Sequence, residues 1–113
     1  MQLAATASRG RVKMYTHVTV KLKYGQLGAF FEMMPKVKAI VEDAGWKMLD
    51  AYYFLNGRIN TMVHIWEMRD MNHYMEGVAL LSAHPDFPAL NAALGEACDE
   101  ETIVFAEKAP YSP

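Results

Sequence analysis

The segment from Ile59 to Met68 constrains the fold more than any other part of the chain, because it is apolar on both of its faces. Its alternating pattern and β-branched residues predict a strand. One face carries Ile59, Val63 and Ile65, and the other carries Met62, His64, Trp66 and Met68. An antiparallel strand with one face in water normally has a polar side, and this strand has none. We therefore expect both of its faces to be covered.

Three further segments have the pattern of strands. Residues 12–22 alternate, with Val12, Met14, Val18, Val20 and Leu22 on one face and Tyr15, His17 and Thr19 on the other. Residues 46–56 and 102–107 predict the other two strands. Asn56-Gly57 accepts the positive φ angles of a two-residue turn, so we expect a tight hairpin there.

Two helical regions separate these strands. Apolar residues from Leu27 to Ala44 recur at spacings of three and four, which predicts an amphipathic helix. Pro35 lies inside it and should kink or break it, because proline lacks the backbone donor and crowds the preceding turn. The second region begins with Asp70 as N-cap and should be interrupted at His84-Pro85.

The order of elements is therefore β-α-β-β-α-β, which predicts a ferredoxin-like α+β fold. We expect a four-stranded antiparallel sheet with a broken second helix and with the helices on one face. The other face would leave several hundred Å² of apolar surface in water, at a cost of about 10 kcal/mol. A second copy of the chain would cover it, so we expect a homodimer. Residues 12–113 should form the domain and residues 1–11 a flexible tail.

Composition excludes several classes of function. The chain has 113 residues, enough for one domain, and a net charge of −2 without a dense basic block, which argues against nucleic-acid binding. No apolar run approaches the roughly 20 residues of a membrane span, and we do not expect the first ten residues to act as a secretory signal, because they lack a basic n-region and a real h-region. The single cysteine, Cys98, fits a reducing compartment, so we expect a cytoplasmic protein. Cys98 itself has the surroundings of a small buried apolar residue.

Histidines on the predicted strands are the candidate catalytic groups. His17 shares a face with Tyr15 and Thr19, and His64 shares a face with Trp66. A strand histidine can act as a general base, since its ordinary pKa lies near neutrality. It can equally be a core residue that donates a hydrogen bond to a backbone carbonyl. His73 and His84 are expected at helix ends or on the surface, in solvated or capping roles.

Other polar and aromatic residues accompany these histidines. Asp50 interrupts an apolar strand, so its carboxylate either faces water or has a partner such as a histidine. Aromatic side chains could line a pocket with hydroxyl donors at its rim, or pack in the core with one hydrogen bond each: Tyr15, Tyr52, Tyr53 and Trp66. The sequence has no metal-ligand spacing, phosphate-binding glycine loop or nucleophile elbow, so we expect no metal and no cofactor.

Residues 15–113 resemble the NIPSNAP family of the dimeric α+β barrel superfamily. The resemblance lies in Gly25-Gln26-Leu27 leading to Phe30, in Gly57-Arg58-Ile59-Asn60, and in His64-Ile65-Trp66. His84-Pro85-Asp86-Phe87 and the ending Pro110-Tyr111-Ser112-Pro113 continue it. Family members commonly have arginines in the helix after the His-x-Trp strand, and residues 72–78 here have none, so no anion-binding role is carried over.

The resemblance implies two kinds of function. Relatives in the superfamily include cofactor-independent monooxygenases, cyclases, lactone isomerases and haem-degrading enzymes, with a pocket between sheet and helices. This implies a small enzyme acting on a hydrophobic small molecule, with His17, His64 or Asp50 as catalytic residues. The alternative is a non-catalytic module that binds a small molecule or another protein.

Overall fold

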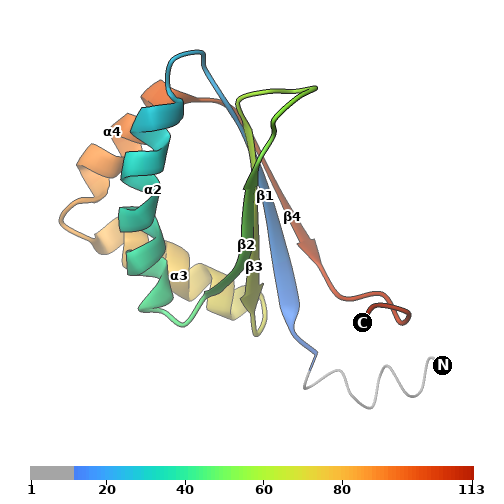
Figure 1. Ribbon diagram of the computed structural model, residues 1–113. Helices are drawn as coiled ribbons and strands as arrows, with labels where there is room; N and C mark the ends of the chain where they lie inside the picture. The colour runs from blue at the N-terminus through green and yellow to red at the C-terminus, as the bar shows by residue number, and fades with distance from the viewer. Residues whose placement is uncertain (1–11) are drawn as a thin grey trace.

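The computed structural model describes residues 12–113, in which three helices cover one face of a four-stranded sheet (Figure 1). The strands are β1 (Met14–Leu22), β2 (Lys47–Tyr53), β3 (Thr61–Met68) and β4 (Cys98–Ala106), and the helices are α2 (Leu27–Glu42), α3 (Met71–Ala83) and α4 (Phe87–Ala97). The strand order is β2-β3-β1-β4, and all neighbours are antiparallel. The ferredoxin-like fold with a divided second helix is therefore confirmed. The expected tail, residues 1–11, lies outside the described residues.

The two faces of the sheet differ in what covers them. Even-numbered residues of β1 and β3 face the helices, and several are at most 3% exposed: Thr16, Val20, Leu22, Met62, Trp66 and Met68. The opposite face carries the odd-numbered residues, including exposed His17 and the half-buried Val63 and Ile65. No element of residues 12–113 lies over this open face (Figure 1). The expected cover by a second copy stays a prediction.

The helix ends follow the sequence signals closely, with one exception. Asp70 caps α3, because its Oδ1 accepts a hydrogen bond of 2.9 Å from the backbone N–H of His73. Pro35, however, does not break α2, which is continuous from Leu27 to Glu42. Pro35 and Phe31 are both exposed, so water can reach the Phe31 carbonyl that lacks its usual donor. The break expected at Pro35 is therefore wrong, whereas the kink expected as its alternative stays a prediction.

The link between β2 and β3 is longer than the expected hairpin turn. It runs over residues 54–60, and the Phe54 N–H donates to the Thr61 carbonyl at 3.0 Å. A two-residue turn at Asn56-Gly57 needs positive φ at both residues. Gly57 has a positive φ of 66°, but Asn56 does not. Among residues 12–113, Asn60 is the only non-glycine residue with a positive φ angle. The tight hairpin is therefore wrong, and Ile59 belongs to the loop rather than to β3.

Candidate functional site

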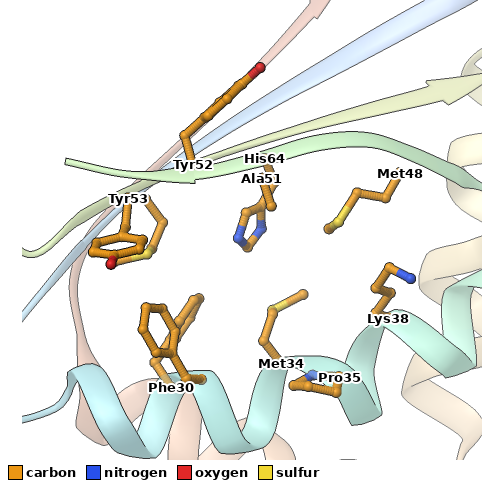
Figure 2. Close-up of a pocket in the computed structure, with 11 residues that line it drawn as sticks. Phe30, Met34, Pro35, Lys38, Met48, Ala51, Tyr52, Tyr53 and His64 are labelled. Carbon is orange, nitrogen blue, oxygen red and sulfur yellow. The ribbon is translucent and has the colours of Figure 1, made fainter. Parts of the chain in front are cut away.

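A cavity of about 230 Å³ lies between the inner side of α2 and strands β2 and β3 (Figure 2). Helix α2 contributes Phe30, Phe31, Met34, Pro35 and Lys38, β2 contributes Met48, Ala51, Tyr52 and Tyr53, and β3 contributes Met62 and His64. Most of this lining is apolar, which is typical of sites for small organic molecules. The helix residues were missed as site residues, because apolar positions at helical spacing look the same whether they fill a core or line a cavity.

His64 is the polar group that projects into this cavity from β3 (Figure 2). Its ring is 6% exposed and stacks on Phe30, with 6.0 Å between ring centroids and an interplanar angle of 23°. Within residues 12–113, no group forms a hydrogen bond with the imidazole. Burial lowers the pKa of His64 below its ordinary value of 6.5, since desolvation disfavours the charged ring. His64 is therefore a neutral imidazole at neutral pH, with nitrogens available to a ligand.

A second cavity of about 260 Å³ lies deeper between the sheet and all three helices. It shares Phe30, Met34 and His64 with the first cavity. Its remaining lining includes Trp66 of the predicted site. Trp66 packs edge-on against Trp46, with 5.4 Å between ring centroids. His64 therefore borders two adjacent spaces.

Tyr53 and Tyr52 are adjacent in β2, yet their rings lie on opposite sides of the strand (Figure 2). Tyr53 faces α2 and packs edge-on against Phe31, with 5.4 Å between centroids. Tyr52 borders the cavity, but its ring points away from it (Figure 2). The Asp50 carboxylate accepts a hydrogen bond from the Tyr52 hydroxyl and raises the pKa of that exposed phenol.

His17 and Asp50 lie on the open face of the sheet, across from His64. Ile65 pairs with His17 on one side and with Asp50 on the other, so one strand separates the two polar residues. Tyr15 is on the same face, with the Lys108 ammonium 5.6 Å from its ring centroid. The structure therefore divides the seven predicted site residues into two groups. His64, Trp66 and Tyr53 face the helices, while His17, Asp50, Tyr15 and Tyr52 face the open side.

His73 is a structural histidine and is not solvated. It is 4% exposed, and its Nδ1 accepts a hydrogen bond of 3.0 Å from the backbone N–H of Arg69. The proton of the neutral ring is then on Nε2, which donates to the Ala44 carbonyl at 2.7 Å. His73 therefore joins the start of α3 to the segment between α2 and β2. His84 lies between α3 and α4, where its Nδ1 accepts from the Asp86 backbone N–H at 3.0 Å.

Cys98 lines neither of the two cavities. Cys98 ends α4 and begins β4, and burial, followed by the charge of Glu101, raises the pKa of its thiol. A raised pKa leaves the thiol protonated at neutral pH, which is unsuited to a nucleophile. Residues 12–113 contain no group of three or more histidine, cysteine or acidic side chains arranged to hold a metal ion. No helix in this part of the chain has the length and hydropathy needed to cross a membrane.

Comparison with known protein families identifies the family of this chain. The profile of the NIPSNAP family matches residues 15–113, which is most of the chain. The chain belongs to the NIPSNAP family. No curated protein matches it in sequence.

Solved structures of two NIPSNAP proteins and of one further protein have a similar fold. A NIPSNAP family protein of unknown function from Agrobacterium tumefaciens is 21% identical, with a TM-score of 0.78 over 90% of this chain and 93% of that chain. A NIPSNAP-like domain protein from Burkholderia xenovorans is 16% identical, with a TM-score of 0.76 over 89% of each chain. A proposed antibiotic biosynthesis monooxygenase from Caulobacter crescentus is 13% identical, with a TM-score of 0.68 over 87% of this chain and 91% of that chain. At these identities the likeness concerns the fold alone.

Proposed function

We propose that this NIPSNAP protein is a small cofactor-independent enzyme that binds a hydrophobic molecule beside His64 and uses that histidine to move a proton. The observation that carries the proposal is a buried, neutral imidazole without a hydrogen-bond partner among residues 12–113, in a cavity with apolar walls. The His64 nitrogens have no partner among residues 12–113 and border the cavity, so a bound ligand can supply the hydrogen bond that the protein does not.

The surroundings of His64 favour its role as a general base. A group with a pKa below the working pH is mostly in its base form, ready to accept a proton. The substrate would lie between Phe30 and Tyr53 and lose a proton from carbon or oxygen to the imidazole. The apolar walls disfavour the imidazolium, so the proton would return to the product readily. Monooxygenase, cyclase and isomerase reactions on activated aromatic substrates can all begin with such a proton removal.

Structural relatives support this reaction class by analogy of fold. Two structural neighbours, from Caulobacter crescentus and Nitrosomonas europaea, are proposed antibiotic biosynthesis monooxygenases. They are 13% and 9% identical to this chain, so their likeness concerns the fold and does not indicate a particular substrate.

Binding is tested with 2-naphthol, which offers an aromatic body and one hydroxyl donor. Calorimetry should detect its binding to the wild-type protein. Ala51 pairs with His64 and lines the cavity, so Ala51→Trp should fill the space and weaken binding at least tenfold. Leu55→Trp is the matched control, because Leu55 lies in the β2–β3 loop and is 83% exposed. Equal affinity in the two variants would place the ligand elsewhere.

Proton transfer is tested without knowledge of the natural substrate. The acidic C–H of 2-tetralone exchanges with deuterium in D₂O, with the proton passing to a base and a deuteron returning to the same carbon. The wild-type protein should accelerate this exchange, and His64→Gln should lower the rate by about 10²-fold or more. His84→Gln is the control, since His84 lies outside both cavities. Loss of exchange in His17→Gln instead would move the site to the open face.

A non-catalytic binding module is the alternative function. It is favoured by the lining of the first cavity, which has no carboxylate and no histidine other than His64. Naphthol binding that depends on Ala51, combined with no acceleration of exchange by the wild-type protein, would select this alternative.

Two expectations from the sequence stay proposals. We propose that a second copy covers the open face, because apolar Val63, Ile65 and Val104 lie there and Val104 is 51% exposed. Sedimentation at micromolar concentration should give a dimer. We also propose a cytoplasmic location from the single cysteine.

A further inference from the structure

We propose that the ligand is an elongated molecule that extends past His64 into the second cavity and ends in a cationic group held by Glu101. The proposal rests on the function proposed above and deepens it by giving the ligand a length and a charge. The occupant of the second cavity is then an organic ammonium at the end of an apolar chain.

The two cavities share part of their lining, which is the first support for an elongated ligand. Phe30, Met34 and His64 line both spaces, so the two cavities adjoin at these three side chains. Methionine has three rotatable bonds and adapts to irregular neighbours, so Met34 is able to move aside for a passing chain. A ligand that occupies both cavities would then contact His64 in its middle part rather than at one end.

Glu101 is the second observation. It lies on β4 opposite Val20, which places its side chain on the helix-facing side of the sheet at the edge of the second cavity. The structure records no ion pair for Glu101 with any residue from 12 to 113. Asn91 of α4 lines the same cavity and can donate or accept a hydrogen bond. The mainly apolar second cavity therefore has the solvent-exposed carboxylate of Glu101 at one edge, with no cationic side chain of residues 12–113 paired to it.

Tyr74 responds to the charge of Glu101, which places the carboxylate close to the cavity wall. Burial is the main cause that raises the pKa of Tyr74, and the negative charge of Glu101 adds to it. Tyr74 lines the second cavity together with Glu101. The field at this end of the cavity therefore favours cations and disfavours anions.

The first cavity has no comparable unneutralised charge. Its rim carries Lys38, whose ammonium is 3.0 Å from the Glu42 carboxylate. The charge of Lys38 is thus already balanced along α2. The two ends of the combined space therefore differ in charge, and this difference fixes the direction in which a ligand with one charged end would bind.

Three probes of equal length test the proposal: 6-phenylhexylamine, 6-phenylhexan-1-ol and 6-phenylhexanoate. Calorimetry at pH 7 and low ionic strength should show the ammonium probe binding about fivefold tighter than the alcohol, and the carboxylate probe weakest. Glu101→Gln should remove the preference for the ammonium. Glu100→Gln makes the same charge change one residue earlier, at a residue that pairs with Arg58 and does not line the cavity, and should keep the preference.

The outcomes separate this inference from the proposed function. If 2-naphthol binds but the three probes bind equally, the inference is overturned. The same holds if Glu101→Gln keeps the wild-type preference for the ammonium probe. In both cases the first cavity remains the proposed binding site. If neither 2-naphthol nor any phenylhexyl probe binds, the proposed function falls and this inference falls with it. If Glu101→Gln removes the preference for the ammonium probe and leaves the affinity for 2-naphthol unchanged, the result supports both this inference and the proposed function.

Discussion

Gly77 in α3 leaves the space that the Trp46 indole occupies. A Cβ added there would lie 2.3 Å from two atoms of the indole, Cε2 and Nε1, and 2.6 Å from a third, Cζ2. The ring has little freedom to retreat. Its Nε1–H donates to the His73 carbonyl at 3.0 Å, and its face stacks on Tyr74 with 5.2 Å between centroids. Gly77→Ala must therefore displace an indole that is held on two sides.

The size of the effect follows from these contacts. Overpacking costs about 1–3 kcal/mol, and weakening the indole hydrogen bond costs about 1 kcal/mol more. Alanine recovers about 1 kcal/mol through its higher helix propensity. We expect Gly77→Ala to lower the free energy of unfolding by about 2 kcal/mol, measured by urea denaturation.

A second glycine provides the control for this substitution. Gly95 lies inside α4, and an added Cβ there would meet nothing within 4 Å. Gly95→Ala should therefore raise the free energy of unfolding by up to about 1 kcal/mol. If Gly77→Ala is as stable as the wild-type protein, the packing of Trp46 against α3 described here is incorrect.

Three further predictions concern pH, a helix cap and a buried histidine. Burial lowers the pKa of folded His64 below 6.5 while the unfolded chain keeps the ordinary value, so the stability it contributes is complete above about pH 6.5 and is lost as pH falls toward the folded-state pKa. Urea denaturation across this pH range should show that the free energy of unfolding depends less on pH in His64→Gln than in the wild-type protein. An equal pH dependence in the two proteins would contradict the burial of the ring. Asp70→Ala should cost about 1 kcal/mol in urea denaturation, whereas Asp70→Asn should cost little, because the amide oxygen can still accept from the His73 N–H. His73→Phe should lower the free energy of unfolding by about 2 kcal/mol, since it leaves the Arg69 N–H and the Ala44 carbonyl without partners, and a stability equal to that of the wild-type protein would show that neither bond matters.

Much of the fold was predictable because its signals are local. The alternation around Val20 and Met62 identifies which residues of β1 and β3 face the helices. Asp70 marks the start of α3 through a cap that spans only three residues. The errors at Pro35 and Asn56-Gly57 have a different origin. Solvent exposure of one helix side, and the φ angles of a seven-residue loop, depend on tertiary context that neither motif contains.

The candidate site was predictable only in part, because a cavity is a property of several elements together. His64 and Trp66 were found through their strand pattern, and Tyr53 through its aromatic neighbours. The sequence could not separate them from His17 and Asp50, since the face that receives the helices is decided by packing rather than by polarity. Phe30 and Met34 gave the ordinary signal of a core helix. Glu101 gave none, because a single acidic residue in a short strand usually faces water.

The most direct test of the account is nuclear magnetic resonance of the His64 ring in protein labelled with ¹³C-histidine. The Cε1–H signal of His64 should titrate with a pKa below 6.5 and should shift when 2-naphthol is added, while the signal of His84 stays in place. If the His64 signal titrates with the ordinary histidine pKa and does not shift with 2-naphthol, the result would contradict the claim that a neutral, unpaired imidazole binds a ligand in this cavity.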